Sequence, residues 1–155
     1  MTEAKLARDR RLAWGIVLAA IALAAVVRFH LRGLPLERDE GELAYAGRLL
    51  LEGVPPYRLA YSMKLPGIYA VYALVMALFG RSAEGIRLGV LLATSVSTIL
   101  LFRLARRFLE PLPSAAAAAS FALLALSQKV LGVYGHATHF VVLAALGGLL
   151  LLPRE

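Results

Sequence analysis

Apolar residues gather in five long charge-free runs, and the longest polar stretch lies between the first two of them. The runs are 15 to 24 residues long and together cover 89 of the 155 positions. They are Leu12–Val27, Leu65–Gly80, Leu88–Phe102, Pro111–Gln128 and Val130–Pro153. The core of so small a soluble domain cannot bury this much apolar chain. The pattern therefore predicts an all-α integral membrane protein, since about 20 apolar residues in a helix cross a bilayer.

The composition agrees with a membrane protein and excludes several other classes. Hydrophobic residues make up 60% of the chain and charged residues 17%, whereas a soluble domain carries about 25% charge. The net charge is +7, but the arginines stand mostly at the ends of apolar runs, where such side chains reach lipid headgroups. We therefore expect the lipid bilayer as a partner and no nucleic acid. The chain has no cysteine, which excludes disulfides and thiolate metal sites.

The N-terminal charges predict how the first helix crosses the membrane. Residues 1–11 carry four basic residues against two acidic ones, so we expect this segment to stay cytoplasmic. The first transmembrane helix is then predicted over residues 12–31. The alternative is a cleaved signal peptide, because Ala22-Leu23-Ala24 resembles a cleavage site.

The remaining runs fit two topologies, and a cluster of Arg103, Arg106 and Arg107 favours one of them. If all five runs span the membrane, this cluster lies outside, against the positive-inside rule. If the run at 65–80 stays on the outer side, the cluster is cytoplasmic and the chain has about four spans. We expect the second topology. Its further segments are transmembrane helices at 86–108, 114–131 and 139–152, a cytoplasmic turn at 109–113, an outer loop at 132–138 and a cytoplasmic end at 153–155.

The extracytoplasmic loop of this topology covers residues 32–85 and contains two predicted juxtamembrane helices, at about 40–52 and 67–79. The first has leucine and alanine on one face and charged residues on another, which is typical of a helix lying on a membrane surface. Asp39 is predicted as its N-cap. A proline is predicted to open the second helix in its first turn.

Asp39 and Lys64 each have a structural and a functional interpretation. A carboxylate at the start of a surface helix is either a cap on a solvated face or a general base for a substrate hydroxyl or amine. An interfacial lysine either extends toward the headgroups or serves as a cation for a lipid phosphate.

Ordered stretches of the chain resemble a known family. They are Arg38-Asp39-Glu40-Gly41-Glu42-Leu43-Ala44-Tyr45-Ala46-Gly47-Arg48, Gly53-Val54-Pro55-Pro56-Tyr57, Met63-Lys64-Leu65-Pro66-Gly67-Ile68-Tyr69 and Ala105-Arg106-Arg107-Phe108. In this order they resemble the first extracytoplasmic loop and the following helix end of GT-C glycosyltransferases. The similarity is to the bacterial protein-mannosyltransferase-like group, which includes aminoarabinose transferases.

The resemblance implies roles for individual residues. Asp39 matches the family's catalytic carboxylate, which deprotonates the acceptor, and the adjoining Glu40 is the second catalytic candidate. Lys64 matches a basic residue that contacts the phosphate of a polyprenyl donor. Arg48 matches an arginine of the same loop helix, and Tyr57 belongs to a group of loop tyrosines that line either the membrane interface or a sugar or prenyl chain.

His136 and His139 stand in the second outer loop, where many relatives carry an acid. Their spacing places them on one helix face if the helix begins early enough. Three interpretations stay open: the histidines sit at the interface, they help to hold the donor phosphate, or they bind a divalent metal together with Asp39. Apart from this possible metal no cofactor is predicted, and the lipid-linked sugar is a substrate.

The resemblance implies a membrane glycosyltransferase that moves a sugar from a polyprenyl phosphate to an acceptor on the extracytoplasmic side of the bacterial cytoplasmic (inner) membrane. Enzymes of the family usually have two or three times as many spans, so the chain is interpreted as an N-terminal part: a truncated reading frame, a fragment or a piece of a split protein. Its expected partners are the missing C-terminal part or another membrane subunit. A non-catalytic subunit or pseudoenzyme is the alternative function, and a small transporter is a third class.

Overall fold

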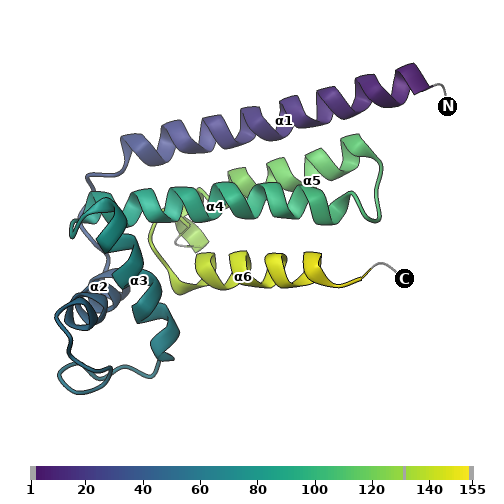
Figure 1. Ribbon diagram of the computed structural model, residues 1–155. Helices are drawn as coiled ribbons and strands as arrows, with labels where there is room; N and C mark the ends of the chain where they lie inside the picture. Colours follow the sequence, from purple (N-terminus) through teal and green to yellow (C-terminus); the bar gives the residue numbers. More distant parts are fainter. Residues whose placement is uncertain (1–2, 131, 154–155) are drawn as a thin grey trace.

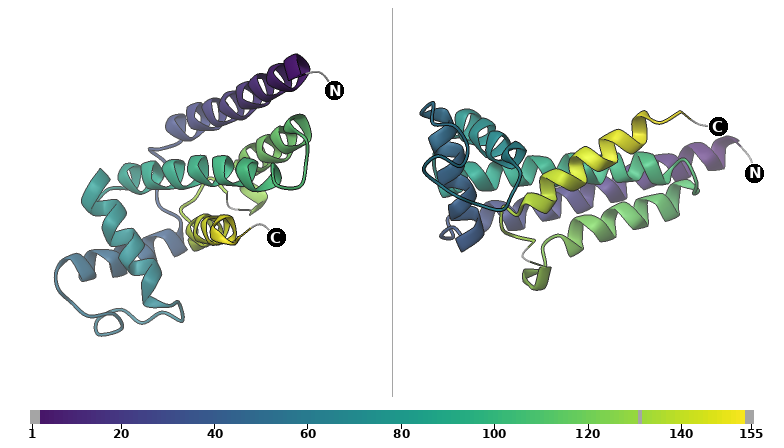
Figure 2. Two further views of the ribbon diagram at one scale, coloured as in Figure 1. Left: turned by 45° about the vertical axis from the view of Figure 1, so that its right-hand side comes forward. Right: turned by 90° about the horizontal axis from the view of Figure 1, so that it is seen from below.

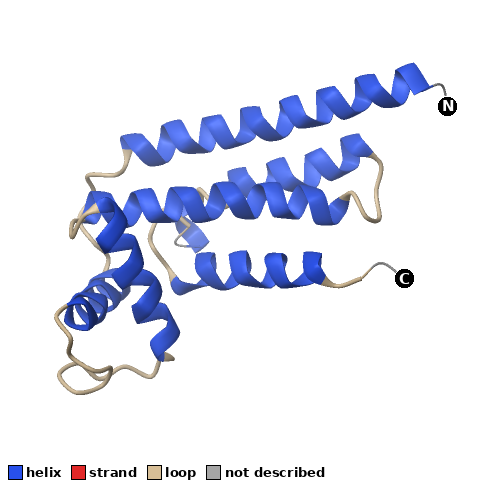
Figure 3. Ribbon diagram, in the orientation of Figure 1, coloured by secondary structure: helices blue, strands red, loops and turns tan. Residues whose placement is uncertain are grey.

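The computed structural model describes residues 3–130 and 132–153, and every regular element in these ranges is a helix (Figure 3). The predicted all-α class is confirmed. The elements are α1 (Glu3–His30), α2 (Arg38–Leu51), α3 (Pro66–Phe79), α4 (Ala83–Ala105), α5 (Pro111–Leu124), the short 3-10 helix η1 (Gln128–Val130) and α6 (Ala137–Leu151).

The helix ends follow local capping chemistry. Proline occupies the first turn of α3 and of α5, where its missing N–H is not needed. Ser82 begins α4 by accepting a hydrogen bond from the Gly85 N–H at 3.1 Å, so this helix starts and ends earlier than the predicted 86–108. The chain leaves α5 at Leu124 and turns through η1, so the predicted helix at 114–131 is shorter than expected.

Glu37, and not Asp39, caps α2. The Glu37 carboxylate accepts a hydrogen bond from the Asp39 N–H at 2.8 Å, and the Glu40 carboxylate accepts one from the Glu37 N–H at 2.9 Å. The Glu37 carboxylate also accepts from the backbone of Glu40, so that Glu37 and Glu40 form a capping box. The prediction that Asp39 is the N-cap was therefore wrong. Its carboxylate is not engaged by the helix terminus, because the acid two residues earlier takes that role.

Four helices run lengthwise through the molecule in alternating directions (Figures 1 and 2). The start of α1, the turn from α4 to α5 and the end of α6 lie at one end, while α2, α3 and the segment joining α5 to α6 lie at the other. α4 is central and packs against α1, α3, α5 and α6. This arrangement brings segments that are distant in sequence together at each end of the bundle.

The pair of α2 and α3 forms a separate layer, steeply inclined to α1, α4, α5 and α6 (Figure 1). Gly47 allows the two helices to approach, because a Cβ there would lie 2.9 Å from the Cβ of Tyr72 and 3.0 Å from the backbone nitrogen of Ala73. A buried cluster of Leu43, Tyr69, Tyr72, Met76 and Ile86 joins this layer to α4. Tyr69 and Tyr72 are therefore core residues.

Within the described ranges, two helices, α1 and α4, are long and apolar enough to cross a membrane. α5 and α6 are apolar as well, but their 14 and 15 residues extend only about 21–23 Å at a rise of about 1.5 Å per residue. Large hydrophobic side chains remain exposed on α1 and α6, among them Leu18, Leu23, Val26 and Val141. The outer faces of the bundle are thus apolar.

Candidate active site

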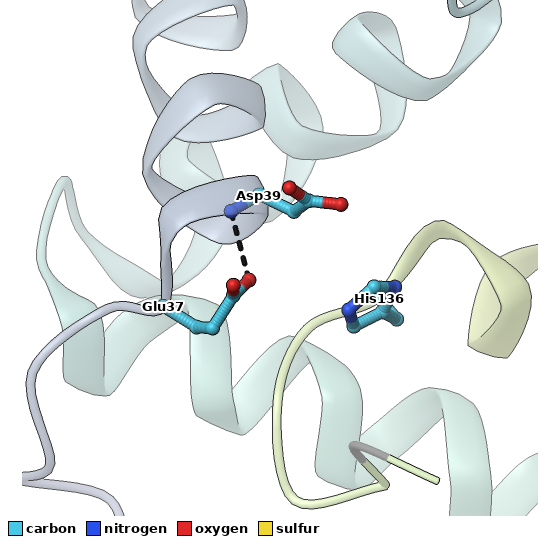
Figure 4. Close-up of side chains that lie close together, drawn as sticks. All are labelled: Glu37, Asp39 and His136. Atoms are coloured by element: carbon cyan, nitrogen blue, oxygen red, sulfur yellow. Dashed lines mark hydrogen bonds between the residues drawn. The ribbon is translucent and has the colours of Figure 1, made fainter.

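The candidate site lies at the end of the bundle that carries α2 and α3. The first turn of α2, the loop before α3 and the segment before α6 meet there, and Figure 4 shows the side chains of Glu37, Asp39 and His136 close together. These segments come from three separate parts of the chain.

Asp39 and Lys64 form the outer layer of the site. The Lys64 Nζ lies 3.4 Å from the Asp39 Oδ2, and both side chains are partly exposed. Arg38 also reaches the other carboxylate oxygen, at 3.3 Å, but 90% of its side chain is exposed. The hydrogen bond and charge of Lys64 are the main cause that lowers the pKa of Asp39, and Arg38 adds to the effect. The carboxylate is thus held ionised beside a cation that it can share with a ligand.

Glu40, the next residue of α2, forms a buried inner layer of the site. Its side chain has no exposed surface and pairs with Arg87 of α4 at 2.9 Å. The second carboxylate oxygen accepts a hydrogen bond from the Gly135 N–H. A buried carboxylate needs this full set of donors, because an ion without partners is costly to remove from water. Glu40 therefore connects α2 to α4 and to the segment before α6.

Arg87 of α4 also holds the segment before α6 in place. Its guanidinium donates hydrogen bonds to the carbonyl oxygens of Val133 and Pro35, both at 3.1 Å, and lies 4.9 Å from the ring centre of Tyr134. Arg28 of α1 acts in a similar way, donating to the carbonyl oxygens of Ala125 and Gly132 at 2.8 Å each. These two arginines thus set the path of the chain up to His136.

Tyr72 is the third buried side chain of the inner layer of the site, beside Glu40 and Arg87. Its hydroxyl donates a hydrogen bond to the Gly135 carbonyl, and burial raises its pKa above the ordinary tyrosine value. A side chain at Gly135 has no room, because a Cβ there would lie 2.6 Å from the Tyr72 hydroxyl and 3.0 Å from Glu40 Oε1. Both backbone polar groups of Gly135 are thus hydrogen-bonded, the N–H to Glu40 and the carbonyl to Tyr72. His136 is the next residue of the chain.

His136 and His139 lie in different surroundings. His136 is the N-cap residue of α6 and offers a nitrogen to the group that contains Glu37 and Asp39, with all three ligand atoms within 4.8 Å of one another. His139 lies one turn further along and lines a groove of about 430 Å³ with Phe121, Leu124 and other residues of α5 and α6. Of the possible metal set of Asp39, His136 and His139, the described geometry brings Asp39 and His136 together with Glu37, while His139 faces the groove.

The residues present suit a divalent cation in part. Two carboxylates and an imidazole are common ligands, and the buried Nε2 of His136 has no hydrogen-bond partner among the described residues. However, the Glu37 carboxylate already caps α2, and Lys64 already neutralises Asp39. Any metal bound here would compete with the lysine.

Tyr57 supports the loop that carries Lys64. Its hydroxyl donates a hydrogen bond to the Lys64 carbonyl at 2.7 Å, and the hydroxyl of Tyr69 reaches the same oxygen at 3.3 Å. The Tyr57 backbone has a φ of 67°, a left-handed conformation that is uncommon for a bulky residue. Tyr57 and Tyr69 therefore fix the backbone from which the Lys64 side chain reaches Asp39.

Arg48 lies in the last turn of α2, and its described partner is Glu52. The two side chains meet at 2.8 Å, four residues apart on the exposed face, and Arg81 approaches the same glutamate at 3.9 Å. No described contact joins Arg48 to Asp39 or Lys64.

Comparisons with known proteins agree with the resemblance found in the sequence. The family model described as "Dolichyl-phosphate-mannose-protein mannosyltransferase" matches residues 63–153, which is more than half of the chain. The chain belongs to this family. The matched range begins one residue before Lys64 and contains Arg87, His136 and His139, whereas the acids of α2 precede it.

Two curated relatives extend the similarity toward the N-terminus. Both are named "Undecaprenyl phosphate-alpha-4-amino-4-deoxy-L-arabinose arabinosyl transferase", one from Pseudomonas paraeruginosa and one from Pseudomonas aeruginosa. Each is 35% identical over 126 residues, which cover 76% of this chain and 23% of the relative. The chain thus spans about a quarter of the length of these relatives. No solved structure matches the chain.

Three contributors to the site have weak signals in the sequence. Arg87 and Arg28 each border an apolar run, and an ionisable residue at such a position marks a structural or functional contact in a membrane protein. Glu37 precedes another glutamate by three residues, a spacing close to that of a capping box. These signals identify the residues as candidates but do not identify their partners.

Proposed function

We propose that this chain forms the donor-side part of a membrane glycosyltransferase that uses a polyprenyl-phosphate sugar on the extracytoplasmic side of the bacterial cytoplasmic membrane. The observation that carries the proposal is the 3.4 Å contact between Asp39 and Lys64, which joins a base and a cation across 25 residues. Family membership and the lipid-linked sugar in the relatives' names support the substrate class.

The proposed chemistry assigns one task to each residue of the pair. Asp39 accepts the proton from the acceptor hydroxyl or amine, whose oxygen or nitrogen then forms the bond to the anomeric carbon. The bond between that carbon and the phosphate oxygen breaks, and the lipid phosphate leaves with the electron pair. The Lys64 ammonium stabilises the charge that develops on this oxygen.

Glu40 has a positioning role in this proposal. Its carboxylate is used entirely by Arg87, by the Gly135 N–H and by the Glu37 N–H, so no donor or acceptor reaches it from solvent. It keeps the first turn of α2 against α4, and thereby holds Asp39 opposite Lys64. Tyr57 does the same for the lysine loop, while His136 lies beside Asp39 at the edge where a sugar or phosphate enters.

The membrane placement that we propose has four spans, with α1, α4, α5 and α6 crossing and the N-terminus in the cytoplasm. The alternating directions of these helices support it, as does the inclined layer of α2 and α3 at one end. Arg103, Arg106 and Arg107 then lie at the cytoplasmic end. α5 and α6 are short for full spans, so the bilayer is expected to be thinned locally beside them.

The test replaces the matching quarter of a full-length arabinosyl transferase with this chain and measures transfer from its undecaprenyl-phosphate donor in membranes. Asp39→Asn should lower the initial rate by about 10²–10⁴-fold, the typical worth of a general base, while donor binding persists. Glu42→Gln is the matched control, since this acid of the same helix is exposed and has no described ion pair. An Asp39→Asn rate within about threefold of the parent removes the base assignment, since the expected loss is far larger.

A second arm uses the isolated chain in detergent and measures binding of undecaprenyl phosphate itself. Lys64→Ala should weaken this binding, because the lysine contacts the phosphate before and during transfer. Asp39→Asn should leave it nearly unchanged. Donor binding by the chain without transfer in the chimaera supports the alternative of a non-catalytic subunit.

A further inference from the structure

The end of the bundle opposite the candidate site holds a cavity that the transferase chemistry does not use. It measures about 530 Å³ and lies between the start of α1, the end of α4 and the end of α6. Arg10, Arg103, Arg106 and Arg107 line it together with Trp14 and Leu150. No acidic residue lines it.

The four arginines of this cavity have no carboxylate partner in the described part of the chain. The ion pairs of the described residues involve other cations, such as Arg8, Arg48 and Lys64. Four like charges around one cavity repel one another, and the repulsion is relieved when an anion enters. The cavity therefore has the electrostatic character of an anion site.

Two of the arginines are anchored and two are available. Arg107 donates hydrogen bonds to the carbonyl oxygens of Leu149 at 3.1 Å and Leu152 at 3.2 Å, and so caps the last turn of α6. Arg106 donates to a carbonyl in the turn after α4. Arg10 and Arg103 are exposed and make no hydrogen bond to a described residue. The anchored pair gives the cavity its shape, and the available pair can close on a ligand.

The remaining walls select a ligand with an apolar part. The Trp14 ring packs edge to face on Phe102 with centroids 4.8 Å apart, and tryptophan is typical of the membrane–water interface. The apolar wall continues with Leu150 and Leu152 of the α6 end, and Leu152 is 58% exposed. A phosphate group suits the guanidinium forks, and acyl chains suit the apolar surface next to them.

We propose that this cavity binds the headgroup phosphate of an anionic phospholipid, with Arg10 and Arg103 as the residues that close on it. The proposal requires the chain to lie in a bilayer, but it is independent of the transferase chemistry because the two sites lie at opposite ends of the bundle (Figure 1). Basic pockets between membrane helices are known binding places for acidic lipid headgroups.

The competing explanation is a diffuse attraction of all N-terminal charge to the headgroups, which depends on net charge alone. Two charge-matched double variants separate the explanations. Arg10→Gln with Arg103→Gln removes two charges from the cavity. Lys5→Gln with Arg11→Gln removes two exposed charges from α1 that do not line it. Neither variant removes the backbone caps made by Arg106 and Arg107.

The measurement is native mass spectrometry of the 155-residue chain in detergent with equal amounts of phosphatidylglycerol and phosphatidylcholine. The parent chain and the Lys5/Arg11 variant should each retain one phosphatidylglycerol in preference to phosphatidylcholine. The Arg10/Arg103 variant should bind it about tenfold or more weakly, since each basic contact is worth about 1 kcal/mol. Unfolding temperatures of the lipid-free variants check that the fold is unchanged.

Three results would overturn the proposal: equal loss of lipid in both double variants, equal retention in both, or no preference of the parent for phosphatidylglycerol. Inorganic phosphate added in excess forms the last arm. It should displace the lipid only weakly, because it lacks the acyl chains. Complete displacement of the lipid by this excess would instead identify a site for free phosphate and would also overturn the proposal.

Discussion

The Arg87 guanidinium lies 2.9 Å from the Glu40 carboxylate, and the two side chains are 4% and 0% exposed. This pair joins α4 to the first turn of α2, the same turn that carries the acid that we assign as the base. Breaking a buried pair on one side leaves a charge without a partner, which typically costs about 3–5 kcal/mol.

The first prediction concerns the stability that this pair provides. Arg87→Leu and Glu40→Leu should each lower the free energy of unfolding by about 3–5 kcal/mol. The double variant should lose less than the sum, since neither charge then remains. Arg48→Leu is the control, because its pair with Glu52 has a similar distance of 2.8 Å but is exposed and is worth about 0.3–0.5 kcal/mol. Equal losses for Arg87→Leu and Arg48→Leu in denaturant unfolding would contradict the buried role.

The second prediction tests the close approach of α2 and α3. Gly47→Ala should destabilise the fold by about 1–3 kcal/mol, because the new Cβ meets Tyr72 and Ala73 at 2.9 to 3.0 Å. Gly41→Ala, in the same helix with nothing within 4 Å of the new Cβ, should instead stabilise it by about 0.5–1 kcal/mol. Thermal unfolding of both variants in the same detergent gives the comparison. The expected result is an opposite sign at the two glycines.

The third prediction concerns the pKa of Asp39. Lys64 is the main cause that holds it below the ordinary value of 3.8, so Lys64→Ala should raise the pH at which Asp39 takes up its proton. Arg38→Ala should raise it less, since Arg38 makes the smaller contribution. Because the pKa of this carboxylate is depressed, its pairing favours the folded state above the unfolded pKa and is lost as the pH falls through the folded one.

A pH titration of the ¹³C-labelled Asp39 carboxyl by NMR measures this pKa in the isolated chain, without any assay of transfer. If Arg38→Ala moves the titration more than Lys64→Ala does, the ion pair described for Asp39 is assigned to the wrong cation.

The fourth prediction concerns topology. Reporter fusions after Arg107 should lie in the cytoplasm, while fusions after Lys64 and after Gly80 should both lie outside. The reason is that the turn after α4 lies at the same end as the start of α1, whereas both ends of α3 lie at the other end (Figure 1). A cytoplasmic reporter at Gly80 together with an external one at Arg107 would establish five spans in place of four.

Local sequence was sufficient for the helical class and for the proline that begins α3, because apolar runs and capping preferences act over a few residues. It did not predict the start of α5 at Pro111, which was placed in the preceding turn. It also carried the family resemblance, since the ordered stretches around Asp39 and Lys64 are visible in the chain itself. The N-cap of α2 was misassigned because several acids stand close together at the start of this helix. Local preference does not decide which of them turns back to the helix terminus.

Only the tertiary structure distinguished the neighbouring acids Asp39 and Glu40. Consecutive helical residues point about 100° apart, so the packing of α4 and of the segment before α6 decides which of the two is buried. Glu40 finds Arg87 at a separation of 47 residues and the Gly135 N–H at a separation of 95. His136 likewise reaches the acids of α2, whereas His139 turns away into the groove beside α5. No local pattern encodes such contacts, because they arise when helices far apart in sequence meet at one end of the bundle.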